Sequence, residues 1–337
     1  MSGYPETAGM SEQIVRRSTT RKRPVVRGSL LAALAALLNL LLGCNSFSLN
    51  LLSREKTDKT GADTRVLPAP PGRYTFRIAP YVFLSDFEVK PDMPLFQELA
   101  KLRDQVYHEL QLTPGRSTVQ VYLFESKERY DEFMHAHYAN LPPRRAFFIQ
   151  QQRVMGGVDD LLVYTRWGDR IQQDLRHELT HALLHSVMRD VPLWLDEGLA
   201  EYFELPPERH GINASHVETL RRDLGLSFQA DIDRLEKLKD VNEMKGPEYR
   251  EAWLWVHLML HSRPEAKTVL LTYLQELRAN RNPGLLEPRL AAVFPALAET
   301  FKKHLEQIEL PINARATPMP ATGHPTVKEE THHESHE

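Results

Sequence analysis

The strongest constraint on the fold of this chain is the pentapeptide His177-Glu178-Leu179-Thr180-His181, which has the pattern H-E-x-x-H. Four residues of an α-helix turn through about 400°, so the two imidazoles lie one turn apart on the same face. From there both rings can reach one metal ion at the ~2.1 Å of a zinc–nitrogen bond. Glu178 lies about 100° around the helix, where its carboxylate can accept a proton from metal-bound water. The motif therefore predicts a helix and suggests a hydrolytic metal site.

Composition limits which groups could hold such an ion and which partners the chain can bind. The 337 residues include one cysteine, Cys44, which excludes a disulfide framework and any multi-cysteine metal site within the chain. A metal must therefore be held by histidines and carboxylates. Acidic residues outnumber basic ones by 45 to 42. The first 43 residues hold six basic groups and two acidic ones, so the acidic excess is larger in the remainder. The rest of the chain is acidic, which argues against phosphate-driven binding of nucleic acid.

The amino-terminal segment has the pattern of an export signal. Six arginines and lysines between residues 16 and 27 precede Leu30–Leu42, an almost unbroken run of leucine and alanine. This run would span roughly 20 Å as a helix, less than the ~30 Å hydrocarbon core of a bilayer. The tetrapeptide L-L-G-C, residues 41–44, overlaps the end of this run. It resembles the bacterial lipobox, in which the cysteine thiol receives a diacylglyceryl group.

We therefore expect residues 1–43 to be a lipoprotein signal peptide and Cys44 to carry the lipid. Residues 44–72 are polar and then proline-rich, which is typical of a flexible tether. The mature protein is accordingly predicted to be exported and lipid-anchored to the cell-envelope membrane, on its periplasmic or extracytoplasmic face. The alternative is an ordinary signal or anchor helix that ends at an incidental cysteine.

Two patterns of secondary structure follow the tether. Over residues 73–168, segments rich in β-branched and aromatic residues alternate with helical segments, which predicts a mixed α/β subdomain. Over residues 169–310 the apolar residues recur with helical spacing. The expected strands are 74–87, 118–124, 145–150 and 161–165, and the expected helices are 94–112, 128–138, 171–188, 195–204, 216–224, 249–261, 267–279 and 291–307.

The predicted fold is therefore α+β, with a mixed α/β subdomain that carries the active-site helix and a mostly helical C-terminal subdomain after it. Along the sequence, the helix with H-E-x-x-H is the first element of the helical segment, residues 169–310. The tail, residues 311–337, consists largely of proline, threonine, glutamate and histidine and is expected to be disordered.

A third candidate ligand lies sixteen residues after His181. Glu197 belongs to the segment P-L-W-L-D-E-G-L-A-E-Y, whose start at a proline suits a second helix. Two imidazoles and one carboxylate leave the fourth tetrahedral position for water, as a hydrolytic zinc site requires. Glu201 follows one helical turn after Glu197 and can accept the free ring N–H of a ligating histidine. The alternative for Glu201 is a solvent-facing glutamate.

These motifs resemble those of the gluzincin metallopeptidases of the peptidase MA group, in which H-E-x-x-H is followed by a glutamate ligand within W-x-x-E-G-x-A. The resemblance is strong over residues 171–204. Over residues 73–310 the organisation is similar to that of a bacterial lipoprotein family of unknown function. The resemblance implies a zincin-like fold in which Glu178 is the general base. The zinc ligands that it implies are His177, His181 and Glu197.

A gluzincin also needs a group that stabilises the oxyanion formed when water attacks a carbonyl carbon. In the related aminopeptidases this group is a tyrosine that opens a later helix, and the segment P-E-Y-R-E-A-W resembles that helix start, with Tyr249 as its tyrosine. A phenol that donates a hydrogen bond to the developing charge contributes on the order of 3 kcal/mol. The alternative is a tyrosine that only packs at a helix start. His257 and His261 are further candidates for donating this hydrogen bond in place of Tyr249.

The favoured function is a zinc-dependent peptidase at the bacterial cell envelope that acts on peptide or protein substrates. The alternative is a catalytically silent lipoprotein that uses the same fold as a binding or scaffolding module. The related aminopeptidases hold the substrate amine with the glutamate of a G-x-M-E-N segment, whereas this chain has M-G-G-V-D-D at residues 155–160. An exopeptidase is therefore disfavoured unless Asp159 or Asp160 takes the place of that glutamate.

Overall fold

The computed structural model describes residues 67–153, 157–226 and 228–310. The predicted signal peptide, the lipidation site Cys44, most of the predicted tether and the tail after residue 310 lie outside these residues. In the part of the chain that the structure describes, no helix is long and apolar enough to cross a membrane.

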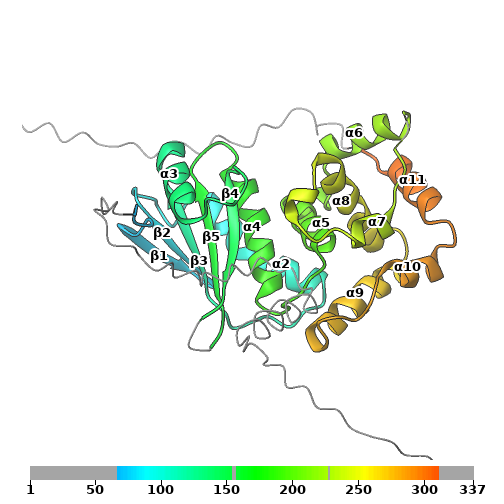
Figure 1. Cartoon of the computed structure of the whole chain (residues 1–337), viewed down its shortest axis with the longest axis horizontal. Coiled ribbons are helices and arrows are strands. Elements are labelled where there is room, and N and C mark those ends of the chain that lie inside the picture. The colour runs from blue at the N-terminus through cyan, green and yellow to red at the C-terminus, as the bar shows by residue number, and fades with distance from the viewer. Residues whose placement is uncertain (1–66, 154–156, 227, 311–337) are drawn as a thin grey trace, which may run out of the picture. The chain divides into compact units, whose positions relative to one another are not determined.

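The described chain forms a sheet followed by a predominantly helical part (Figure 1). The strands are β1 (Tyr74–Ile78), β2 (Tyr81–Ser85), β3 (Val119–Phe124), β4 (Ala146–Gln151) and β5 (Asp160–Arg166). The helices are α2 (Pro94–Glu109), α3 (Lys127–His137), α4 (Ile171–His185), α5 (Leu193–Phe203), α6 (Ala214–Leu224), α7 (Ile232–Glu236), α8 (Gly246–His261), α9 (Pro264–Ala279), α10 (Glu287–Val293) and α11 (Leu297–Gln307), with short 3₁₀ helices η1 (Pro207–Arg209) and η2 (Val241–Glu243).

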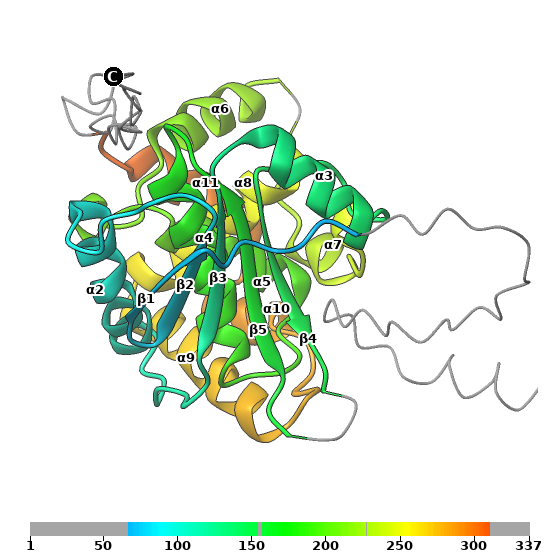
Figure 2. The same cartoon turned by 90° about the vertical axis from the view of Figure 1, so that its left-hand side faces the viewer.

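The five strands form one mixed sheet in the order β1-β2-β3-β5-β4, visible side by side in Figure 2. β2, β3 and β5 run parallel, while β1 and β4 pair antiparallel at the two edges. Alternate residues of β5 enter different cores: Leu161 and Val163 join the main core with α2 and α4, and Leu162 and Tyr164 join a smaller core with α3. The sheet therefore lies between α3 and α4.

The helical part is built around α8. Every residue of α8 from Glu251 to Leu260 is buried, because α5, α6, α7, α9 and α11 all contact this helix. α4 contacts both β5 and α5, and one continuous hydrophobic core includes residues of the sheet and of the later helices. This packing confirms the α+β fold class and the helical C-terminal part.

Two predicted elements are divided by proline. The expected strand 74–87 is a hairpin of β1 and β2, in which the turn contains Pro80. The expected helix 291–307 is split into α10 and α11 around Pro295, because proline disfavours helical backbone at the residue before it. Phe294 is accordingly extended, with φ −126° and ψ 94°.

α5 packs tightly against α8 at Gly198. A Cβ atom placed on Gly198 would lie 2.7 Å from the carbonyl oxygen of Ala252 and 3.0 Å from Cγ2 of Val256. The first of these is a backbone atom of a buried helix, which cannot move aside as a flexible side chain can. The glycine is therefore required by the contact with α8.

We predict that Gly198→Ala lowers the free energy of unfolding by about 1–2 kcal/mol. Overpacking a core costs about 1–3 kcal/mol, and the better helix propensity of alanine recovers at most about 1 kcal/mol of this. Urea denaturation of the purified protein measures the change. Gly168→Ala is the control, since its Cβ would meet nothing within 4 Å, and the packing argument fails if both variants are equally stable.

Candidate metal centre

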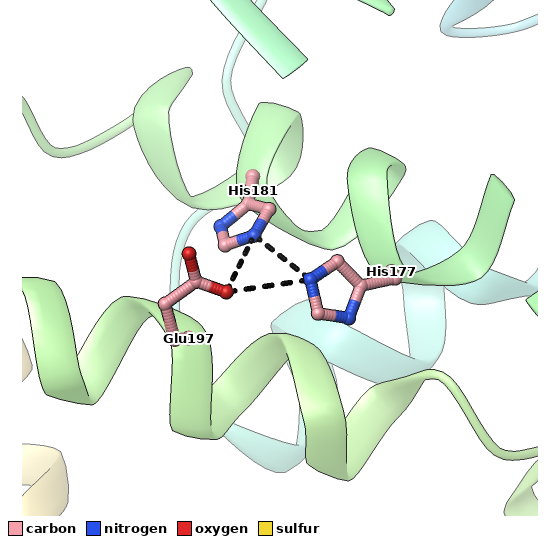
Figure 3. Close-up of side chains that lie close together, drawn as sticks. All are labelled: His177, His181 and Glu197. Carbon is pink, nitrogen blue, oxygen red and sulfur yellow. Dashed lines mark hydrogen bonds and ion pairs between the residues drawn. The ribbon is translucent and has the colours of Figure 1, made fainter. Parts of the chain in front are cut away.

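The three predicted ligands lie on two helices that pack against each other. His177 and His181 lie one turn apart on α4, and Glu197 projects toward them from α5 (Figure 3). α4 also contacts β4 and β5, which fixes the motif between the sheet and α5. His181 and Glu197 are 6% and 4% exposed, while His177 is partly exposed. One edge of the cluster is therefore open.

Distances within the cluster agree with tetrahedral zinc. The Nε2 atoms of His177 and His181 are 3.3 Å apart, and Oε2 of Glu197 lies 3.4 Å from the first and 3.6 Å from the second. Tetrahedral bonds of about 2.1 Å require ligand atoms about 3.4 Å from one another. Two imidazoles and one carboxylate are also a donor set that hydrolytic zinc sites use. These residues therefore fit a zinc ion and leave its fourth position free.

The electrostatics of the cluster also favour a cation. Oε2 of Glu197 is buried and accepts no hydrogen bond from any residue that the structure describes. Burial would lower the pKa of the histidines, yet nearby carboxylates raise the pKa of His181 to about 10 and that of His177 well above its ordinary value. Burial would raise the pKa of Glu197, but the two imidazoles lower it well below the usual range. The site thus attracts either protons or a metal ion.

A carboxylate lies beside the outer nitrogen of each histidine. Nδ1 of His181 is 2.9 Å from Oδ2 of Asp196, and Nδ1 of His177 is 3.5 Å from Oε2 of Glu204. Such carboxylates orient a ligating imidazole and increase its basicity. Glu201, which the sequence suggested for this role, is paired with Nε2 of His216 at 2.9 Å.

Glu178 lies at the junction of two cavities. The main cavity has a volume of about 880 Å³ and is lined by residues that include Arg144, His177, Glu178 and Tyr249. The small cavity has a volume of about 80 Å³ and is lined by Glu178, by two of the predicted ligands and by apolar residues that include Phe147. Burial raises the pKa of Glu178 although both histidines oppose this effect. A carboxylate of raised pKa suits proton transfer near neutral pH.

Tyr249 lies in the first turn of α8 and faces the main cavity. Its hydroxyl oxygen accepts a hydrogen bond of 2.5 Å from Nη2 of Arg144, and Nη1 of the same guanidinium lies 4.0 Å from Oε1 of Glu197. Burial raises the pKa of Tyr249, so the phenol keeps its proton. Arg144 therefore connects Tyr249 to Glu197.

The reserve candidates have other partners. Nδ1 of His257 lies 2.8 Å from Nε2 of His304, and Nε2 of His261 lies 2.7 Å from the Tyr202 hydroxyl. In the loop before β5, Asp159 accepts a hydrogen bond from Gln150, and Asp160 at the start of that strand pairs with Arg153. These contacts do not support a role for the two histidines as oxyanion donors or for the two aspartates as ligands of a substrate amine.

Sequence reasoning missed Arg144, Asp196 and Glu204. Asp196 directly precedes Glu197, so the paired acids of W-L-D-E-G were an available signal. Glu204 lies seven residues after Glu197, two helical turns on, which was also within reach of a periodicity argument. No local pattern marks Arg144, because its contact with Tyr249 joins residues 105 positions apart.

The segment that contains the centre is similar to a family of undefined function. Residues 173–283 match the family described as a protein of unknown function, DUF1570. The match covers about a third of the chain and includes His177, His181, Glu197 and Tyr249. No curated protein matches the chain.

We predict that the protein binds about one zinc ion per chain and that Glu197→Gln loses it on dialysis. Removing one of three ligands should weaken binding by more than the roughly 10–100-fold typical of outer partners such as Asp196. Zinc content measured after dialysis by atomic emission tests this. Glu299→Gln on α11, whose carboxylate pairs with Lys303, is the control and should retain the ion. Full zinc occupancy in Glu197→Gln would disprove the ligand assignment.

Proposed function

We propose that this protein is a zinc-dependent peptidase of the gluzincin type. The observation that carries the proposal is the open cluster of His177, His181 and Glu197, beside which Glu178 lines a large cavity. A structural zinc site would use a fourth protein ligand, whereas three ligands leave a position for water. The main cavity, at about 880 Å³, offers room for a segment of peptide substrate.

The chemistry follows from the residues around this cluster. Zinc bound here would lower the pKa of a water molecule and polarise a carbonyl group. Glu178 accepts a proton from the attacking water as the oxygen adds to the carbonyl carbon. It then returns this proton to the amide nitrogen when the C–N bond breaks, so the products are a carboxylic acid and an amine.

Tyr249 has a separate role in this proposal. Its hydroxyl remains protonated and faces the main cavity, where it can donate a hydrogen bond to the carbonyl oxygen of the substrate. Negative charge on that oxygen increases as water adds. The hydrogen bond therefore stabilises the transition state more than the bound substrate.

The same proposal places the protein at the cell envelope. The basic segment, the apolar run and Cys44 support export and lipidation, and the acidic composition supports a protein or peptide substrate rather than nucleic acid.

We predict that Glu178→Gln keeps zinc but slows peptide cleavage by about 100-fold to 10,000-fold, because the amide cannot accept the proton. Tyr249→Phe should keep zinc and slow turnover by about 100-fold or more. Cleavage of a peptide library by zinc-loaded proteins measures both effects. Tyr273→Phe on α9, which removes a hydroxyl that donates to the carbonyl oxygen of Gly284 in the loop after that helix, is the control.

Two outcomes contradict the assignment. If Glu178→Gln cleaves as fast as the wild type, the proposed site is wrong. If the zinc-loaded wild type cleaves no peptide in a broad library, the peptidase proposal fails and a silent binding lipoprotein is the better explanation.

We further predict that Cys44→Ser releases the protein from the membrane fraction without changing its unfolding curve. Stable anchoring needs more than one acyl chain, and a mature lipoprotein carries several, so the change should be nearly complete. Metabolic labelling with a fatty acid identifies the modified residue. Labelling that persists in Cys44→Ser would contradict the lipidation site.

A further inference from the structure

Arg144 enters the centre from a segment that is fixed on both sides. Pro142 and Pro143 precede it and restrict the backbone, and the edge strand β4 begins two residues later. The next residue, Arg145, forms a bidentate ion pair with Asp174 on α4, one turn before the metal motif. This pair holds the segment against α4, so the position of Arg144 is set by the same helix that carries the histidines.

The guanidinium of Arg144 lies between the proposed metal ligands and the phenol. Nη2 donates to the Tyr249 hydroxyl at 2.5 Å, and Nη1 lies 4.0 Å from Oε1 of Glu197, the oxygen that faces away from the histidine cluster. Arg144 lines the main cavity, the small cavity and a third cavity beside α3. It therefore lines the main cavity, which we assign to the substrate, as well as two further cavities.

The direction of these hydrogen bonds leaves donors available. Arginine carries five N–H groups and no acceptor, so the Tyr249 oxygen must accept from Arg144. The hydrogen of the phenol is then free to point into the cavity. The guanidinium also retains N–H groups beyond those directed at Tyr249 and Glu197. Two neighbouring groups can thus donate to one substrate atom.

We propose that Arg144 is a further catalytic residue, which binds the carbonyl oxygen of the scissile peptide together with Tyr249. This inference rests on the proposed hydrolysis. As water adds to the carbonyl carbon, the electron pair of the C=O bond moves to the oxygen, which becomes an anion. Arg144 and Tyr249 donate hydrogen bonds to this anion until the C–N bond breaks and the electron pair returns. A charged donor in a partly buried site is the stronger of the two.

A planar guanidinium also matches a carboxylate, so Arg144 could instead hold the C-terminus of a short substrate. The two roles differ in which kinetic constant they affect. A group that acts on the oxyanion lowers kcat and leaves KM nearly unchanged. A group that holds a terminal carboxylate raises KM for substrates with a free C-terminus and not for their amides.

The experiment compares wild type, Arg144→Gln and Arg144→Lys on one cleavable peptide, prepared with free and with amidated C-terminus. We expect Arg144→Gln to lower kcat by about 100-fold to 1,000-fold on both forms, with KM changed by less than about threefold. Arg144→Lys should recover part of the loss, because it keeps the charge but not the planar fork. Arg129→Gln is the matched control: it removes an equal charge from α3, at a side chain that pairs with Asp86 and lines none of these three cavities, and its kcat should be unchanged.

Zinc content and thermal melting of each variant show that the fold and the metal are retained. Adding Tyr249→Phe to Arg144→Gln should cost much less than the product of the single effects, because Arg144 also holds the phenol. An unchanged kcat in Arg144→Gln overturns the proposal. So does a rise in KM that is confined to the peptide with a free C-terminus.

A second measurement separates this proposal from the proposed peptidase activity. Inorganic phosphate, a tetrahedral anion, is titrated into the zinc-loaded proteins and followed by calorimetry. We expect phosphate binding to weaken at least about tenfold in Arg144→Gln and to be unchanged in Arg129→Gln. If the wild type hydrolyses no peptide but shows this pattern, the peptidase proposal fails while Arg144 remains an anion-binding residue of the centre. Equal phosphate affinity in all three proteins, or no binding to the wild type, overturns the role of Arg144.

Discussion

The contact between α5 and α8 at Gly198 is the constraint on which the candidate site depends. Glu197 adjoins this glycine on α5, and Tyr249 lies three residues before Ala252, the contact residue on α8. The spacing of the two helices therefore sets how far the phenol lies from the proposed metal ligands. A larger residue at Gly198 would separate these groups even if every polar side chain were kept.

The parts of the site that follow helical geometry were predictable from the sequence. The spacing of His177 and His181 predicts that both lie on one face of a helix. Pro192 predicts the start of the second helix, which carries Glu197. The distances of 3.3–3.6 Å between their ligand atoms are what that reasoning implies. The α+β fold class was likewise predictable, because segments rich in β-branched residues precede segments whose apolar residues recur at helical spacing.

The rest could not be read from local patterns. Which carboxylate lies beside His177 depends on how α4 and α5 cross. This crossing places Glu204 beside Nδ1 of His177, whereas Glu201 pairs with His216 of α6. The position of Arg144 depends on the sheet order, because β4 lies at the edge beside α4. The division of the predicted helix 291–307 was predictable, because Pro295 lies within it and proline interrupts a helix.

The site combines contacts of very different sequence separation. His177, His181 and Glu197 lie within a single pair of consecutive helices, so bringing them together closes only a short loop. Arg144 and Tyr249 meet across 105 positions, and their contact requires the sheet, α4 and α8 to be packed together. Bringing the three proposed ligands together therefore requires only the contact of α4 with α5. Zinc retention would thus report mainly on the contact of α4 with α5, whereas the contact of Arg144 with Tyr249 reports that the sheet, α4 and α8 have packed together.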